Sequence, residues 1–279
     1  MPVVAKDIVA RIAPQAHPVY REAFEDRQGL LAEFGITTPL RFSHFLAQAF
    51  VETGGLAKLV ESGVYSAKGL GKQWDIGNWH SFFASRDECV AMAEQCKRDK
   101  GEALFNRVYM RKTLGNVSPG DGWKFRGRGI IQTTGRANYK GLGKTFKVGF
   151  EDEPDLVATP SHALKAALGH WRAKHLNAAA DANDIAVITK GINGGLGALD
   201  ERKAAFARIF SVAKDNRAIE ESTEWQVQEK LNAAGFPCGK PDGVIGKDTR
   251  AAILAYRAKR GLPMTTAITP DLLRSLGVG

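Results

Sequence analysis

The most specific pattern in this sequence is the stretch Phe125-Arg126-Gly127-Arg128-Gly129-Ile130-Ile131-Gln132-Thr133-Thr134-Gly135-Arg136-Ala137-Asn138-Tyr139. Its glycines at 127 and 129 let another group approach the backbone closely. Its amides and hydroxyl are groups that hold a sugar or a water molecule, at Gln132, Thr134 and Asn138. The stretch lacks the Gly-Lys-Ser/Thr ending of a phosphate loop and the glycine spacing of a dinucleotide fingerprint. It therefore predicts a polar binding site and argues against both nucleotide motifs.

Upstream of this stretch, a helix expected over residues 40–53 carries a carboxyl near its end. At about 100° per residue, Phe42, Leu46 and Ala49 form an apolar stripe. Glu52 lies on the margin of that stripe, where contact with aromatic surface would desolvate it and raise its pKa, as a general acid requires. Gly54-Gly55 then ends the helix. The other interpretation is an ordinary surface glutamate in a last turn.

A second carboxyl, Glu61, follows nine residues after Glu52. Glycoside hydrolysis needs two carboxyls, one that protonates the leaving oxygen and one that activates water or attacks the sugar. Because nine residues can extend over about 30 Å, the spacing permits either carboxyl separation known for glycosidases and selects neither.

Taken together, these segments resemble glycoside hydrolase family 19 and its related phage endolysins. The matching stretches, in family order, are residues 45–55, Glu61 with Tyr65-Ser66-Ala67, the stretch at 125–139, and Ile192-Asn193-Gly194-Gly195. The resemblance implies a mainly α, lysozyme-like fold of the α+β superfamily. The short separation of the two glutamates looks more like the endolysin branch than the plant chitinases, whose second glutamate lies much further along the chain.

The resemblance also implies roles for single residues. It makes the protein an inverting glycosidase in which Glu52 is the general acid, Glu61 is the general base and Thr134 helps to hold the attacking water, with Thr133 as the alternative holder. The implied substrate-binding residues are Tyr65, Gln132, Asn138 and Asn193. Val51 stands where many relatives carry a histidine before the acid.

A polar stretch at residues 214–223 marks the expected boundary between a catalytic domain, 1–215, and a tail, 222–279. The tail is expected to form three short helices. The first covers 225–234, the second covers 249–260, and the third follows Thr269, which is expected to be the N-cap of that third helix. It resembles the three-helix peptidoglycan-binding domain through Val227-Gln228-Glu229-Lys230-Leu231-Asn232, Phe236, Asp242-Gly243-Val244-Ile245-Gly246 and Thr249-Arg250-Ala251-Ala252. A small helical interaction module of another kind is the alternative.

Helical periodicity dominates the rest of the first 215 residues. The expected helices cover residues 3–13, 18–35, 40–53, 86–98, 161–174, 184–192 and 198–213. Long glycine-rich segments at 54–80 and 111–130 separate them and are where a site is expected. Three tryptophans in these segments, Trp74, Trp79 and Trp123, are either sugar-stacking platforms or packing for the loops.

The composition narrows the class of protein. The chain has 279 residues, 44% of them hydrophobic, and 39 Lys+Arg against 30 Asp+Glu give a net charge of +9. These values argue against disorder and a fibrous rod. The basic residues are scattered and form no nucleic-acid-binding motif, so the charge indicates attraction to an acidic cell wall and to an anionic outer-membrane surface. We expect a monomer without a membrane span or a secretion signal.

The cysteines and histidines predict neither a disulfide framework nor a metal site. Cys89 and Cys96 lie about 10.5 Å apart along an expected helix, beyond disulfide reach, and with Cys238 are interpreted as small buried hydrophobes in a reducing cytosol. The histidines show no metal-ligand spacing, and we expect no cofactor.

The sequence therefore predicts an endolysin that hydrolyses the β-1,4 glycosidic bonds of peptidoglycan as a muramidase. The resemblance to phage endolysins implies that it is made in the host cytoplasm and reaches the wall after a phage holin releases it. A chitinase and a non-catalytic wall-binding protein are the alternatives. An amidase or peptidase lacks support, because neither a zinc-ligand set nor a Cys/His nucleophile pair is present.

Overall fold

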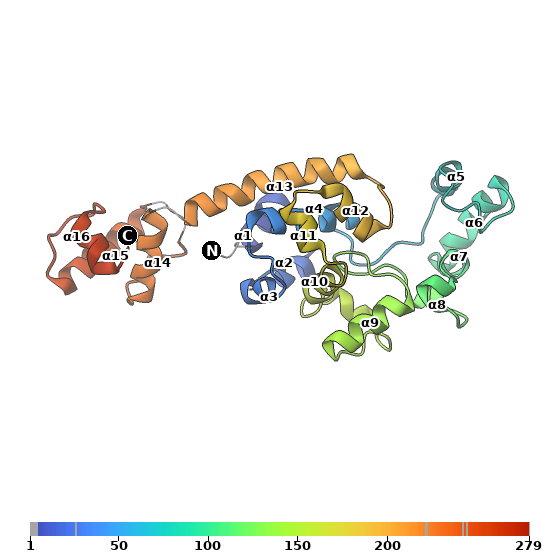
Figure 1. Cartoon of the computed structure of the whole chain (residues 1–279), viewed down its shortest axis with the longest axis horizontal. Coiled ribbons are helices and arrows are strands. Elements are labelled where there is room, and N and C mark those ends of the chain that lie inside the picture. The colour runs from blue at the N-terminus through green and yellow to red at the C-terminus, as the bar shows by residue number, and fades with distance from the viewer. Residues whose placement is uncertain (1–4, 26, 221–222, 242, 244, 279) are drawn as a thin grey trace. The chain divides into compact units, whose positions relative to one another are not determined.

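The computed structural model describes residues 5–25, 27–220, 223–241, 243 and 245–278. The chain divides into two compact units, Pro2–Ile209 and Phe210–Gly279. Both are built from helices, and the β pairing within the described residues consists of isolated bridges (Figure 1). The expected mainly α class is confirmed.

The helices of the first unit differ from the expected ones in several places. They are α1 (Ala5–Ile12), α2 (Pro18–Ala23), α3 (Gln28–Glu33), α4 (Pro39–Glu52), α5 (Ala67–Asp75), α6 (Arg86–Asp99), α7 (Glu102–Val108), η1 (Lys112–Leu114), α8 (Asp121–Lys124), α9 (Arg136–Phe146), η2 (Pro154–Ala158), α10 (Ala163–Ala173), α11 (Leu176–Asp181), α12 (Ile185–Asn193) and the start of α13 (Leu199–Glu220). The prediction of a single helix over 18–35 is wrong, because this range contains two separate helices, α2 and α3. The segments expected to be irregular contain α5, η1 and α8.

Two of the unexpected helices, α5 and α9, contain two glycines each. Glycine costs about 1 kcal/mol in a helix relative to alanine, so local propensity argues against both helices. Tertiary packing compensates: Leu70 of α5 and Tyr139 of α9 are completely buried. The sequence pattern missed these helices because their stability comes from distant contacts.

Helix α13 is longer than predicted. It continues past residue 213 to Glu220 and so includes much of the polar stretch from which we placed the boundary. The division between the compact units falls within this helix, between Ile209 and Phe210. Whether residues 1–215 and 222–279 fold as separate domains stays a prediction.

Helix α4 buries the apolar stripe that its sequence predicted. Phe42, Phe45 and Leu46 are completely buried, and the helix packs against α11 and α12. Thr38 caps its N-terminus by accepting a hydrogen bond from the N–H of Arg41 at 3.2 Å, and the helix ends at Glu52. The long buried helix thus delivers a carboxyl to a defined place.

A second cluster of aromatic side chains holds α5, α6, α7 and α8 together. Trp79 is 8% exposed, the rings of Trp74 and His80 are 4.4 Å apart, and those of Trp123 and Phe105 are 5.9 Å apart. All three tryptophans therefore pack this part of the unit. The three cysteines of the chain are buried and form no disulfide, as expected of small hydrophobic residues.

The glycine-rich stretch forms a narrow turn that pairs with the chain before α5. Arg128 bridges to both Val60 and Thr133. Gly129 has φ +76°, and a Cβ at this position would lie 2.5 Å from the carbonyl oxygen of Val157. The expected close backbone approach is thus confirmed at Gly129, where a side chain would collide with η2.

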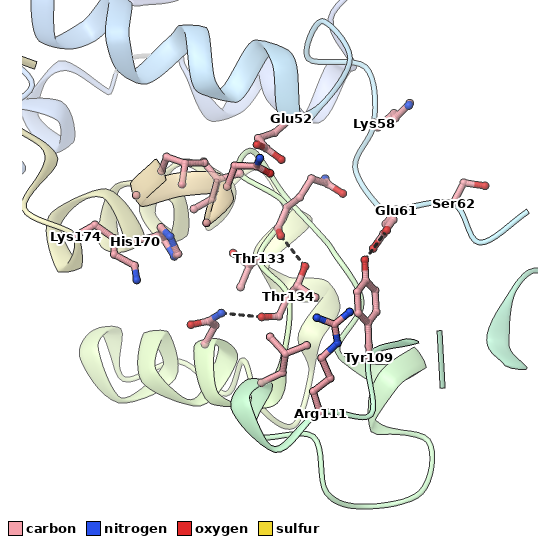
Figure 2. Close-up of a pocket in the computed structure, with 18 of the residues that line it drawn as sticks. Glu52, Lys58, Glu61, Ser62, Tyr109, Arg111, Thr133, Thr134, His170 and Lys174 are labelled. Atoms are coloured by element: carbon pink, nitrogen blue, oxygen red, sulfur yellow. Dashed lines mark hydrogen bonds between the residues drawn. The ribbon is translucent and has the colours of Figure 1, made fainter. Parts of the chain in front are cut away.

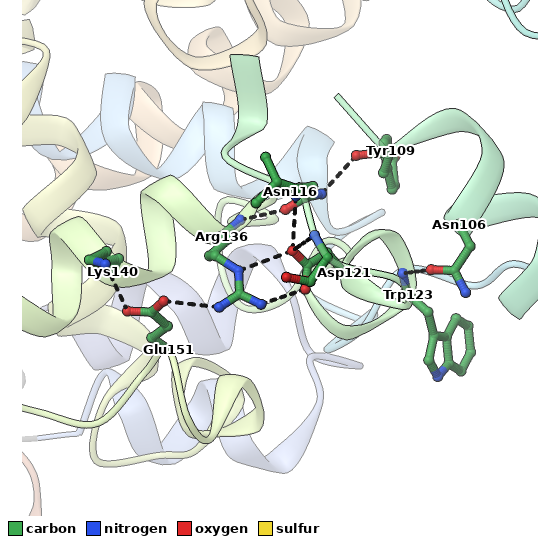
Figure 3. A network of polar contacts seen from close by, with 10 residues as sticks. Asn106, Tyr109, Asn116, Asp121, Trp123, Arg136, Lys140 and Glu151 are labelled. Carbon is green, nitrogen blue, oxygen red and sulfur yellow. Dashed lines mark hydrogen bonds and ion pairs between the residues drawn. The ribbon is translucent and has the colours of Figure 1, made fainter. Parts of the chain in front are cut away.

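A buried polar network fixes the end of this turn (Figure 3). The carboxylate of Asp121, 3% exposed, accepts a hydrogen bond from Nη2 of Arg136 at 2.6 Å. Asn116 accepts from the backbone N–H of Arg136 and donates to the carbonyl of Tyr109, both at 2.8 Å. The network therefore connects the first residue of α9 to Tyr109 at the end of α7.

The second unit contains the three expected tail helices, α14 (Thr223–Ala233), α15 (Lys247–Arg260) and α16 (Pro270–Leu276). Its core includes Val227, Ile253 and Leu272, all completely buried. Thr269 occupies the expected N-cap position of α16 but makes no cap hydrogen bond, because its hydroxyl accepts one from the buried guanidinium of Arg257. Asp242 and Val244 of the matched motif lie outside the described residues.

In the described ranges, none of the helices combines the length and apolar character needed to cross a bilayer.

Candidate active site

One cavity of the first unit brings the predicted site residues together (Figure 2). Its volume is about 790 Å³. The walls come from the end of α4, the segment after it, the glycine-rich turn, the start of α9 and the end of α12. All seven sequence-predicted residues line it: Glu52, Glu61, Tyr65, Gln132, Thr134, Asn138 and Asn193. The three tryptophans do not line it.

Glu52 is the last residue of α4, and its side chain is 17% exposed. Its Oε1 accepts a hydrogen bond from Nη2 of Arg202 at 2.6 Å. The Arg202 side chain on α13 is 3% exposed and also donates to Oε1 of Gln48 at 2.6 Å. The low exposure agrees with the partial desolvation expected of Glu52, but the ion pair with a buried guanidinium was not predicted.

Arg202 is not predicted by any motif of the sequence. It lies 150 residues from Glu52, and no local pattern connects the two. A signal for a polar partner was nevertheless present, because Gln48 lies one turn before Glu52 on a helix whose neighbouring positions are apolar. Gln48 is completely buried. A buried amide and a carboxyl at i and i+4 require a common donor, which a forked guanidinium supplies.

Glu61 has a different environment. It lies in the irregular segment after α4, next to Val60, which pairs with Arg128 of the glycine-rich turn. Its Oε1 accepts a hydrogen bond from the hydroxyl of Tyr109 at 2.7 Å, and its Oε2 accepts one from the N–H of Gly127 at 3.2 Å. Burial raises the pKa of Glu61, while the bonds from Tyr109 and Gly127 oppose that rise. The charge of Glu52 contributes a smaller rise to the pKa of Glu61.

Gly127 explains why the signature needs a glycine next to Glu61. A Cβ at this position would lie 3.1 Å from Oε2 of Glu61 and 3.0 Å from Oε1 of Gln132. Both distances are shorter than comfortable contacts. The absence of a side chain therefore lets the carboxylate reach the backbone N–H.

Tyr109, the other donor to Glu61, was also missed. It lies at the C-cap of α7, and its ring stacks on Phe105 with a centroid separation of 5.3 Å. No motif includes it. Its position follows from the packing of α7, so the sequence carried no local signal for it.

The polar residues of the turn hold one another in place. The Thr134 hydroxyl donates to the carbonyl of Gln132 at 2.9 Å, and the Asn138 amide donates to the carbonyl of Thr134 at 2.7 Å. Gln132 has φ +51°, an unusual backbone conformation for a non-glycine residue. Thr134 is half-buried whereas Thr133 is buried, so Thr134 offers the more accessible hydroxyl.

The remaining predicted residues, Asn193 and Tyr65, come from distant parts of the chain. Asn193 is the last residue of α12, and Tyr65 precedes the N-cap of α5. The Tyr65 ring packs edge-on against Trp79 at 5.3 Å, and burial raises the pKa of its hydroxyl to about 12. Within the described ranges, no group of three or more His, Cys, Asp or Glu side chains is arranged to hold a metal ion.

Comparison with known proteins gives the family context. A glycosyl hydrolase family 19 domain-containing protein of Haemophilus influenzae is 34% identical over 183 residues, which cover 65% of this chain and 84% of the relative. Residues 226–276 match the family model of a peptidoglycan binding domain.

Two solved structures share the fold at 18% identity. A bacterial family 19 chitinase has a TM-score of 0.51 and aligns over 75% of this chain and 94% of its own. A mutant of chitinase C has a TM-score of 0.52 and aligns over 76% of each chain. The expected lysozyme-like fold is thereby confirmed.

Proposed function

The chain belongs to glycoside hydrolase family 19, and we propose that it hydrolyses the β-1,4 glycosidic bonds of bacterial peptidoglycan as a muramidase. One observation carries the proposal: two glutamates with different environments line one cavity in a chain whose tail matches a peptidoglycan binding domain. Glycosidases use such a pair of carboxyls to protonate the leaving oxygen and to activate water.

In this proposal Glu52 is the general acid. Arg202 hydrogen-bonds to Oε1, and no donor among the described residues bonds to Oε2. Oε2 can therefore carry the proton to the glycosidic oxygen. The guanidinium then stabilises the carboxylate that remains after the proton has left.

Glu61 is the general base. A base must be ionised before the reaction, and the donors Tyr109 and Gly127 both stabilise its carboxylate. Thr134 helps to orient the water that Glu61 deprotonates, and that water attacks the sugar from the face opposite the leaving group. The product would have inverted anomeric configuration.

The tail supports the choice of peptidoglycan. A module that binds the wall raises the effective concentration of substrate near the cavity without contributing to catalysis. The net charge of +9 adds attraction to an acidic envelope, which weakens as salt is added. The second candidate function is chitin hydrolysis, because the same two glutamates can cleave its β-1,4 bonds.

Product analysis tests the proposal. Purified peptidoglycan and chitin are digested with the full chain, the new reducing ends are converted to alditols, and the products are identified by mass spectrometry. We expect muramitol-ended fragments from peptidoglycan. Glucosaminitol ends alone, activity confined to chitin, or cleavage of the stem amide would contradict a muramidase. NMR of the first product anomer tests inversion.

We also propose that the protein lyses a phage-infected host from within, after synthesis in the cytoplasm and release to the wall. Expression in a Gram-negative host with and without a membrane pore tests this role. We expect the culture to lyse when the pore is present. Equal lysis without the pore would contradict the proposed need for release.

A further inference from the structure

The cavity is richer in positive charge than cleavage of a neutral glycan requires. Besides the two glutamates, four permanently charged cations line it, namely Lys58, Arg111, Lys174 and Lys190. The charge of Glu52 is already matched by Arg202, which leaves a net cationic surface. Chitin carries no charge that would match this surface, whereas the peptide stems of peptidoglycan carry carboxylates.

Two of these cations, Lys174 and Lys190, can be placed relative to His170, which also lines the cavity. His170 and Lys174 lie together in Figure 2, well separated from Glu61 and Tyr109. Lys174 is the C-cap of α10, and Lys190 lies in the last turn of α12. The backbone of Gly191, next to Lys190, hydrogen-bonds to His170. Helices α10 and α12 therefore present both lysines around His170.

The two lysines at this end are available to a ligand. Lys174 and Lys190 are exposed, and neither has a hydrogen-bond or ion-pair partner among the described residues. The Nε2 atom of His170 is buried and has no hydrogen-bond partner within the described ranges. Burial and the nearby charge of Lys174 lower the pKa of His170, which disfavours a third positive charge here, while the hydrogen bond to the Gly191 backbone opposes that shift. Two unpaired ammonium groups at one end of a cavity suit a ligand that has carboxylates.

We propose that Lys174 and Lys190 bind carboxylates of the peptide stem on a muramic acid held in the cavity. This inference rests on the proposed peptidoglycan activity and names the feature that separates peptidoglycan from chitin. Wall phosphates share the anionic chemistry. Stem carboxylates are the better match because they repeat along the glycan strand that enters the cavity.

The test compares the double variant Lys174→Gln/Lys190→Gln with the unmodified chain on three substrates. The first is native Gram-negative sacculi, which lack teichoic phosphates. The second is the same sacculi after carbodiimide and excess methylamine have converted their carboxylates to neutral amides. The third is chitin hexaose. Lys68→Gln/Lys144→Gln is the matched control, because both lysines are exposed and lie outside the cavity. Initial rates at subsaturating substrate are expressed as the ratio of variant to unmodified chain, which cancels any change in tail binding.

We expect the double variant to lose about tenfold in rate on native sacculi, since two ion pairs in a concave site contribute roughly this much. On amidated sacculi, and on chitin if chitin is hydrolysed, the rate of the double variant should stay within about twofold of the rate of the unmodified chain. The control variant should stay within the same range on all substrates. An equal loss on native and amidated sacculi would overturn the inference, and so would no loss on native sacculi. If the unmodified chain cleaves chitin but no sacculi, the proposed function itself fails.

Discussion

The two walls of the cavity hold their glutamates in different ways. Glu52 stands at the end of a buried helix and pairs with the guanidinium of another helix. Glu61 stands on irregular backbone and is held by a phenol and a peptide N–H. The same side chain therefore meets a full positive charge on one wall and neutral donors in a desolvated setting on the other. The two carboxyls of one cavity are thus placed in chemically different surroundings.

The largest expected effect comes from removing either carboxyl. Glu52→Gln and Glu61→Gln should each lower the rate on peptidoglycan by about 10³-fold, because each removes one proton-transfer group. In residual activity, Glu61→Gln should lack the acidic limb of the pH profile, which rates measured from pH 4 to 9 check. If Glu61→Gln kept this limb, the assignment of Glu61 as the base would be wrong.

The helical wall is tested next through its guanidinium. Arg202→Ala leaves Glu52 and Gln48 without their shared donor, so we expect about 100-fold lower activity and a loss of about 3 kcal/mol in the free energy of unfolding. Arg202→Lys should recover only part of the activity, because an ammonium lacks the fork that reaches both acceptors. Denaturant unfolding and rate measurements check this.

Lys203→Ala is the control for that substitution. Lys203 follows Arg202 on α13 and makes an exposed ion pair with Asp200. The Lys203→Ala substitution should leave the activity on peptidoglycan and the free energy of unfolding nearly unchanged. If Arg202→Ala behaved like this control, the guanidinium would have no part in positioning Glu52.

The irregular wall is tested through its backbone. In Gly127→Ala the added methyl would press on Glu61 and Gln132, whose atoms lie 3.1 and 3.0 Å from the new Cβ position. We expect about tenfold lower activity with little change in melting temperature, because a small misplacement of a catalytic group is costly to rate. Gly141→Ala is the control, since a Cβ there meets nothing within 4 Å. Equal activities of the two variants would contradict the positioning role of Gly127.

The smallest expected effect is a shift in pH dependence. The base works when ionised, so activity falls as pH drops through the pKa of Glu61. The hydrogen bond from Tyr109 lowers that pKa, and Tyr109→Phe should raise it. The acidic limb of kcat/KM should then move to higher pH by about one unit, because a hydrogen bond to a charged group contributes roughly 1.5–3 kcal/mol.

Tyr20→Phe provides the comparison for that shift. The hydroxyl of Tyr20 is also buried and donates to a backbone carbonyl, that of Lys58, at 2.7 Å. Its removal should leave the acidic limb in place. A shift of the limb to lower pH in Tyr109→Phe would show that Tyr109 does not stabilise the carboxylate of the base.

The helical wall was also the easier one to predict. The stripe of Phe42, Leu46 and Ala49 located α4, and its end at Gly54-Gly55 located Glu52, because helix periodicity is a local property. The glycine-rich stretch identified a site, but its pairing with residues 59–61 joins segments far apart in sequence. The sequence did not predict α5 and α9, because glycine disfavours a helix locally. The packing that stabilises these two helices involves residues far away in the sequence.

What the sequence determined by itself was the set of candidate residues that line the cavity, together with the mainly helical class and the tail that matches a peptidoglycan binding domain. These follow from residue types, spacings and ordered motifs. Only the tertiary structure decided the partners of the two glutamates, Arg202 on one side and Tyr109 on the other. The physical reason is that desolvation and charge pairing depend on which distant side chains fill the space around a group. The cationic end formed by Lys174 and Lys190 likewise exists only after α10 and α12 have folded around His170.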